Sequence, residues 1–189
     1  SYTANNLNQY TEREVLGVID VTGSAVTGAT VSVRLDTNNA ALANRHGEYF
    51  WKTVDADNSS AVFATTNLKV TAYITSGINS LVRSETRSAL LPRTPEAFTW
   101  DLDGNLTSDG LWTNTWNGEN RVVEMKSVAG VPDGLKKKLI FDYDNQGRRT
   151  RKISSSGYSG GSYSTTNITT FIYDGWNIIA ESGQGYTNF

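Results

Sequence analysis

A short motif recurs along this chain, and its recurrence constrains the fold more than any other feature of the sequence. The motif reads aromatic, any residue, aromatic, Asp or Asn, two variable residues, Gly or Asn, one further residue, and an apolar residue. Four copies begin at Phe98, Asn114, Phe141 and Phe171, with Asn114 replacing the first aromatic. A degenerate fifth copy begins at Tyr2. Self-similarity of this kind indicates one supersecondary unit used several times.

Each copy predicts a β-hairpin. Alternate aromatics place two rings on one face of a strand. The Asp or Asn then folds its side chain back onto the turn, and the Gly or Asn supplies the positive φ that closes it. The second aromatics lie at positions 100, 116, 143 and 173, so the spacings are 16, 27 and 30 residues. This irregularity predicts hairpins joined by loops of variable length rather than a strict solenoid.

The segment between the opening copy and the others has a different pattern. Residues 14–20, 29–35, 47–54 and 68–75 read as short strands with turn residues between them. Only 38% of the residues are hydrophobic, which favours sheets with one solvated face. We therefore expect an all-β, antiparallel fold, in which a hairpin sheet carries a small inserted β-sandwich. The expected division is residues 1–13 for the first repeat strand or strands, 14–95 for the sandwich, and 96–189 for the repeat sheet.

Two of the copies carry a family resemblance. The stretches from Tyr143 to Arg148 and from Phe171 to Glu181 resemble the repeats of the Rhs/YD-repeat family of bacterial surface and toxin-delivery proteins. The segment Leu7–Thr11 is similar to one that these proteins place before an inserted domain. Residues 14–91 resemble, more weakly, carboxypeptidase-regulatory-like or immunoglobulin-like sandwiches through residues 17–20 and 47–50.

The resemblance implies a spiral β-sheet, which in full-length relatives curls into a hollow shell around a toxic C-terminal segment. A shell needs many more repeats than the four or five in this chain, and the core-ending sequence of the family has no match here. We therefore expect the chain to supply a strip of such a wall. The resemblance also implies a secreted or cell-surface location.

Composition and charge exclude several functional classes. Lys plus Arg is 17 and Asp plus Glu is 19, which gives a net charge of −2 and argues against a nucleic-acid partner. The chain has no cysteine and a single histidine, His46, so thiolate and multi-histidine metal sites are ruled out. The sequence has no apolar run long enough to span a membrane. We expect no metal and no cofactor.

Aromatic rings are the first candidates for ligand binding. Rings beside Asp or Asn side chains can stack on sugars, so a glycan is the expected ligand. The residues proposed for this contact are Trp100, Trp116, Tyr143, Tyr173 and Trp176. The alternative is that these rings fill the buried face of the sheet, which their alternate spacing favours.

Carboxylates supply the remaining candidates. A glycoside hydrolase needs two of them, and the alternative catalytic pair is Asp144 and Asp174, which the turn chemistry also explains as turn caps. Asp101 and Asp103 alternate like the ligands of a calcium loop, although the distal Glu of such a loop is missing. The segment 157–161 matches G-x-S-x-G, but its Ser/Gly-rich surroundings favour a hairpin loop.

These observations predict a non-enzymatic scaffold of a bacterial surface or secreted protein, with carbohydrate binding. One alternative is a small hydrolase that acts on glycosides through paired carboxylates. The other is an inactive wall fragment of a larger Rhs-type shell, in which unpaired sheet edges would promote self-association.

Overall fold

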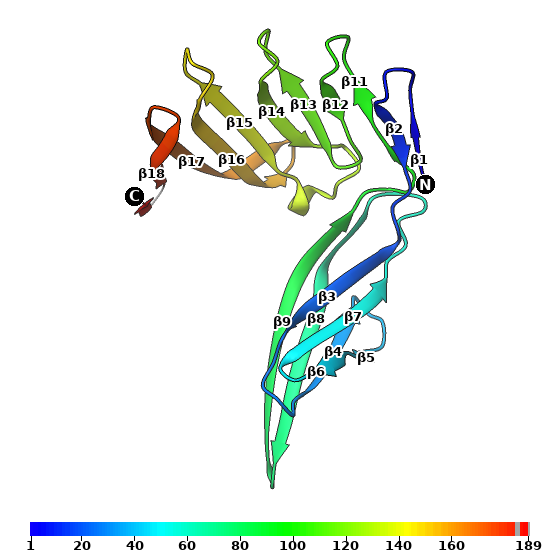
Figure 1. Cartoon of the computed structure of the whole chain (residues 1–189). Coiled ribbons are helices and arrows are strands. Elements are labelled where there is room, and N and C mark those ends of the chain that lie inside the picture. The colour runs from blue at the N-terminus through cyan, green and yellow to red at the C-terminus, as the bar shows by residue number, and fades with distance from the viewer. Residues whose placement is uncertain (184–185, 189) are drawn as a thin grey trace. The chain divides into compact units, whose positions relative to one another are not determined.

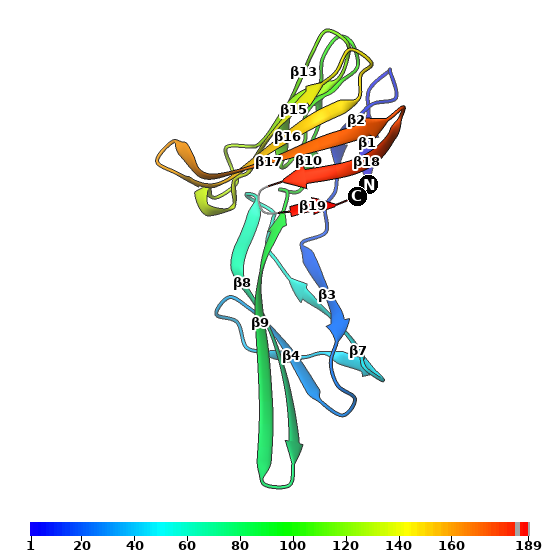
Figure 2. The ribbon, with the colours of Figure 1, turned by 90° about the vertical axis from the view of Figure 1, so that its left-hand side faces the viewer.

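The structure is a computed structural model that describes residues 1–183 and 186–188. Residues 184, 185 and 189 of the expected repeat sheet lie outside the described residues. The chain divides into two compact units, one formed by Ser1–Arg13 with Glu96–Phe189 and the other by Glu14–Pro95 (Figures 1 and 2). We call them the repeat unit and the inserted unit. Both are built from antiparallel strands without an α-helix in the described ranges, so the predicted fold class is confirmed.

The repeat unit consists of hairpins arranged side by side. Strands β11 to β19 form one nine-stranded sheet in chain order, and a second sheet has the order β1-β2-β10. A short 3-10 helix, η1 (Asp133–Leu135), lies between β14 and β15. The strands are β1 (Tyr2–Ala4), β2 (Tyr10–Arg13), β10 (Glu96–Ala97), β11 (Thr99–Trp100), β12 (Leu106–Ser108), β13 (Trp112–Trp116), β14 (Val122–Ser127), β15 (Lys138–Tyr143), β16 (Arg149–Ser159), β17 (Ser162–Asp174), β18 (Asn177–Gly183) and β19 (Tyr186–Asn188).

The opening copy of the motif pairs with the later copies. In β2 and β10, Arg13 lies opposite Glu96 in antiparallel register. Beyond β10, the Phe98 N–H donates to the carbonyl of Thr11 at 2.9 Å, which continues the pairing toward β11. The Arg13 guanidinium also forms an ion pair with the carboxylate of Glu96, which is only 4% exposed. The inserted unit therefore leaves and rejoins the sheet at paired positions.

Four hairpins close through the same five-residue loop, which we call the capped loop. The Oδ1 atom of its first residue accepts hydrogen bonds from the backbone N–H groups of the third and fifth residues, at 2.8–3.0 Å. Its fourth residue has a positive φ of between 56° and 84°, as the sequence predicts. The capped loops are Asn5–Gln9, Asp101–Asn105, Asn117–Arg121 and Asp144–Arg148.

The hairpin of β17 and β18 closes differently. Asp174 pairs directly with Asn177, so only Gly175 and Trp176 form the turn. Gly175 supplies a positive φ of 57° immediately after Asp174, and the chain reverses before a five-residue loop can form. The expectation that Asp174 caps its turn in the same way as Asp144 is therefore wrong.

The repeat sheet buries the first aromatic of two copies of the motif. Phe141 and Phe171 are 5% and 9% exposed, and the Arg149 guanidinium carbon lies 5.2 and 5.3 Å from the centres of their rings. A cation in this position is attracted by both ring faces. Most other side chains of β12 to β16 are half-buried, as expected of a sheet with a single packed layer.

The inserted unit is a sandwich of two sheets with the orders β3-β7-β6 and β5-β4-β8-β9. Its core comes from the inward faces of both sheets and includes Val21, Val31, Val33, Phe50 and Leu68. The strands are β3 (Val18–Ser24), β4 (Thr30–Leu35), β5 (Ala41–Leu42), β6 (Asn44–His46), β7 (Tyr49–Asp55), β8 (Phe63–Ser76) and β9 (Asn79–Leu91).

Candidate functional site: the ring ladder of the repeat unit

The second aromatic of each motif joins its hairpin to the preceding one. Each ring donates its N–H or O–H group to a backbone carbonyl of that earlier hairpin, at 2.8 to 3.0 Å. We call these four hydrogen bonds the ring ladder. They run from Trp100 Nε1 to Tyr10 O, from Trp116 Nε1 to Leu106 O, from Tyr143 Oη to Val122 O, and from Tyr173 Oη to Arg149 O.

The acceptors of the ring ladder occupy equivalent positions. Each is the residue that immediately follows a capped loop, as Val122 follows Asn117–Arg121. Each also lies beside the register shift of its own hairpin, where regular strand pairing is interrupted. The ring donor therefore adds a hydrogen bond to a backbone carbonyl next to a break in the pairing.

The capped loops also contact one another along one rim of the sheet, where the hairpin tips lie side by side in Figure 1. Asn105 donates its side-chain N–H to Asn120 Oδ1 of the next loop at 3.0 Å. The guanidinium carbon of Arg121 lies 5.1 Å from the centre of the Tyr143 ring, and Arg148 lies 5.1 Å from that of Tyr173. In each case the fifth residue of one loop contacts the following hairpin.

The structure divides the five proposed ligand-binding residues into two groups. Trp100, Trp116, Tyr143 and Tyr173 are half-buried, and their polar atoms form the ring ladder. Trp176 lies in the turn between β17 and β18 and is 72% exposed. Trp176 therefore presents the most accessible ring of the five, and glycan binding stays a prediction.

The two carboxylates proposed as a catalytic pair belong to successive hairpins. Asp144 Oδ2 accepts a hydrogen bond from Arg148 Nε at 2.7 Å, while its Oδ1 caps the loop. Burial raises the pKa of Asp144, but the hydrogen bonds from Arg148 and Gln146 outweigh it, and the net pKa lies below the usual value. A general acid must be protonated before it can act, so an Asp that is held ionised in this way is poorly suited to that role. Asp174 is exposed at the end of β17, and the catalytic prediction stays untested.

The proposed calcium loop is a capped loop. Both carboxylate oxygens of Asp101 accept hydrogen bonds from Asn105, at 2.8 and 3.1 Å. The backbone N–H of Asn105 is the main cause of the lowered pKa of Asp101. Within residues 1–183 and 186–188, no group of three or more His, Asp or Glu side chains is arranged to hold a metal ion. The geometry therefore supports a turn-forming role for Asp101.

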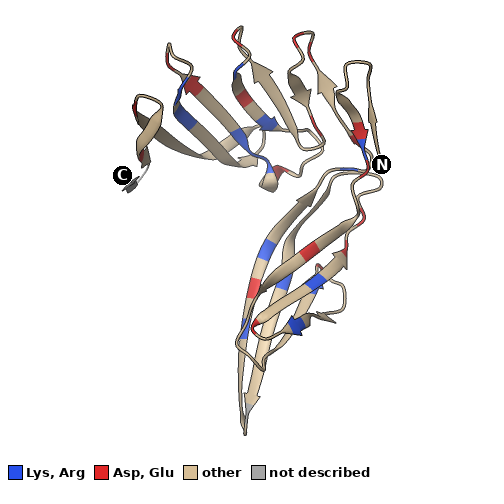
Figure 3. Cartoon of the chain, in the orientation of Figure 1, with Lys and Arg blue, Asp and Glu red and all other residues tan. Residues whose placement is uncertain are grey.

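Charged residues of both signs lie on the strands and loops of the repeat unit (Figure 3). Lys138 pairs with Glu124 at 2.7 Å across β14 and β15, and Lys136 pairs with Asp133 at 2.7 Å. Arg151 pairs with Asp142 on the neighbouring strand. Three basic side chains of this region are therefore paired with acidic neighbours.

No family model matches the chain. The chain is similar to the tRNA3(Ser)-specific nuclease WapA of Bacillus spizizenii, with 30% identity over 90 residues. The match covers 46% of this chain and 3% of the relative, so the chain spans a small fraction of that protein's length. Among the described residues, no helix is long and apolar enough to cross a membrane.

Proposed function

We propose that this chain is a non-enzymatic YD-repeat scaffold, a strip of the wall of a larger surface or secreted bacterial protein associated with toxin delivery. The observation that carries the proposal is the ring ladder, in which the same bond recurs in four successive hairpins. An isolated two-stranded hairpin is only marginally stable in water. Bonds from each hairpin to its predecessor suit a sheet that extends by adding further copies.

The similarity to the WapA nuclease supports the toxin-associated setting. It covers only 3% of that protein, so the proposal does not extend the relative's nuclease activity to this chain. The engagement of Asp144 with its own loop supports the non-enzymatic part of the proposal. Self-association through the outer strand β1 is part of the same proposal, because a sheet edge offers unpaired backbone groups.

Carbohydrate contact is a second candidate function, favoured by Trp176. Its ring is 72% exposed in a two-residue turn, and a ring in that position can stack on a sugar without disturbing the ring ladder. This contact would add ligand binding to the scaffold without adding chemistry.

The test is one incubation of the purified chain with oligosaccharides, fluorogenic glycosides and esters, and unfractionated tRNA. Released product and retained ligand are both measured. The scaffold proposal predicts no product with any substrate. Product that disappears in Asp144→Asn or Asp174→Asn would overturn it in favour of an enzyme. Retained oligosaccharide should be lost in Trp176→Ala and kept in Trp51→Ala, because Trp51 is a 46% exposed Trp on β7.

A further inference from the structure

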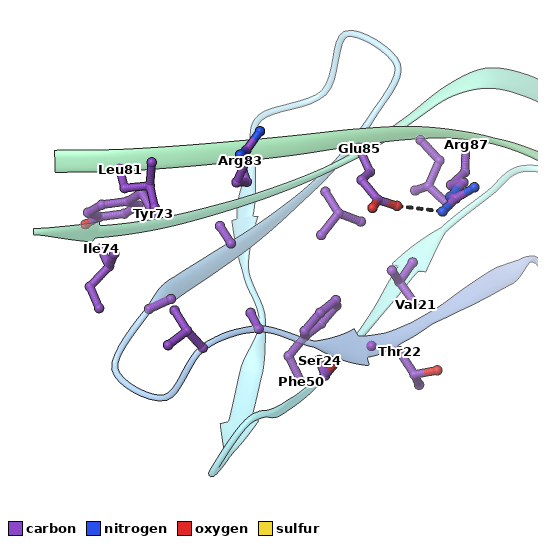
Figure 4. Close-up of a pocket in the computed structure, with 17 residues that line it drawn as sticks. Val21, Thr22, Ser24, Phe50, Tyr73, Ile74, Leu81, Arg83, Glu85 and Arg87 are labelled. Atoms are coloured by element: carbon purple, nitrogen blue, oxygen red, sulfur yellow. Dashed lines mark hydrogen bonds and ion pairs between the residues drawn. The ribbon is translucent and has the colours of Figure 1, made fainter.

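The inserted unit contains a groove of about 540 Å³ between β3 and the β8–β9 hairpin (Figure 4). Its floor is apolar and includes Val21, Phe50, Leu68, Val70 and Ala72. Gly23 lies beside this floor, because a Cβ at that position would be 2.6 Å from the Phe50 ring. A volume of this size falls within the range of about 300–1,000 Å³ that is typical of binding sites.

The groove lies where the smaller sheet lacks a strand. The sheet β3-β7-β6 has three strands, the facing sheet has four, and β3 and β9 are their outermost strands on this side. Residues Leu81, Arg83, Glu85 and Arg87 of β9 lie opposite Ile74, Ala72, Val70 and Leu68 of β8, so they share the inward face of the sheet. A fourth strand beside β3 would cover this face.

At every second residue of β3, the backbone N–H group points to the outer edge of the sheet, away from β7. Ala25 N–H donates to Glu48 O and Ala56 N–H donates to Gly17 O, both at 2.8 Å. In antiparallel pairing the hydrogen-bonded pairs alternate with non-bonded ones, so the odd-numbered residues of β3 bond to β7. The N–H groups that face away from β7 belong to Val18, Asp20, Thr22 and Ser24.

The wall of the groove on β9 carries one unbalanced positive charge. Glu85 pairs with Arg87 at 2.6 Å, while Arg83 has no ion pair within the described part of the chain (Figure 4). Charges on the inward face of an edge strand discourage the docking of purely apolar strands. A strand that carried one carboxylate opposite Arg83 would instead be attracted.

We infer that β3 accepts an extended peptide segment of a partner protein, which adds to the sheet as a fourth strand. Alternate apolar side chains of the peptide cover the floor of the groove, and one Asp or Glu pairs with Arg83. Backbone hydrogen bonds to β3 supply affinity, and the alternate side chains supply specificity. This attachment site goes beyond the proposed scaffold function and rests on the inserted unit alone.

The test is a selection of displayed random nonapeptides on the whole chain, with Arg83→Glu as the counter-target. The enriched peptides should alternate apolar and polar residues and place an acidic residue among the apolar positions. The best peptide is then synthesised, and its affinity is measured by fluorescence anisotropy. Arg83→Glu should weaken binding by about tenfold or more, whereas Arg93→Glu, an equal change of charge at an exposed site, should leave it unchanged.

A second variant tests the strand edge. Thr22→Pro removes a free N–H of β3, and proline is tolerated on an edge strand whose N–H faces solvent. It should also weaken binding about tenfold, with the urea midpoint measured to confirm folding. Failure to enrich peptides on the wild type over Arg83→Glu would overturn the inference, as would equal binding to Thr22→Pro. A dimer that Thr22→Pro abolishes would overturn it in favour of a second copy of this chain.

Discussion

The hydroxyl group of Tyr143 donates a hydrogen bond to the backbone carbonyl of Val122, which is 2.8 Å away and 21 residues earlier in the chain. The bond joins the hairpin of β15 and β16 to that of β13 and β14. Trp116 makes the same bond to Leu106, so an indole and a phenol perform one task at equivalent positions. The repeated motif therefore specifies how neighbouring hairpins are joined, in addition to how each one turns.

Replacing Tyr143 with Phe tests a single bond of the ring ladder. The ring stays, but the carbonyl of Val122 loses its donor, so we expect a loss of about 1 kcal/mol in the free energy of unfolding. The measurement is urea denaturation followed by tryptophan fluorescence. Tyr158→Phe is the matched control, because the ring of Tyr158 packs against Tyr163 and its own ring contact is kept. Equal losses in the two variants would argue against the bond.

Replacing Asp144 with Ala tests the capped loop. Asp144 Oδ1 accepts hydrogen bonds from the backbone N–H groups of Gln146 and Arg148 at 2.9 Å. In the Ala variant both N–H groups would lose this acceptor. We expect a loss of about 1–2 kcal/mol, similar to that of a helix cap, measured from the urea midpoint. Asp174→Ala should cost much less, because Asp174 begins a two-residue turn. A larger effect at Asp174 would contradict this assignment.

The capped loops could be predicted from the sequence because their chemistry is local. The side chain of Asp101 or Asp144 reaches backbone groups two and four residues later, and Gly104 or Gly147 has the φ that closes the loop. The motif therefore contains all the partners of its own turn. The last hairpin could not be predicted in this way, because Gly175 allowed a shorter turn.

The ring ladder was not predicted, because its acceptors lie 10 to 90 residues away from its donors and are backbone groups without a sequence signal. One signal was present on the donor side. The first aromatic is Phe at 98, 141 and 171, whereas the second is always Trp or Tyr, which carry an N–H or O–H group.

Strand β9 was also missed, because its residues 79–88 are exposed and show no alternation of buried and exposed positions.

The stability of the repeat unit should fall at acidic pH. The pKa values of Asp101 and Asp144 are lowered in the folded chain, so the unfolded chain binds more protons as the pH falls below about 5. The stabilisation is present above the pKa of an unfolded Asp, near about 4, and is lost as the pH falls through the folded pKa. The urea midpoint of the wild type should therefore decline in this range more steeply than that of the double variant Asp101→Asn/Asp144→Asn. Parallel curves would contradict the assignment.

Gly147→Ala tests the closing residue of a capped loop. Gly147 has a φ of 82°, and an added Cβ would lie 3.2 Å from Arg121 Nη1. We expect a loss of about 1 kcal/mol or more in the free energy of unfolding. Asn8→Gly, at the equivalent position with a φ of 60°, should be tolerated because glycine adopts that conformation readily. The two unfolding curves, measured side by side, make the comparison.

Hydrogen exchange of Tyr143→Phe, compared with the wild type, tests most directly the claim that the repeat unit is one scaffold joined hairpin to hairpin. If the ring ladder couples neighbouring hairpins, amides in β13 and β14 as well as β15 and β16 should exchange roughly fivefold faster, which corresponds to about 1 kcal/mol. The strands of the inserted unit should be unchanged. Faster exchange confined to the hairpin that contains residue 143 would contradict the account.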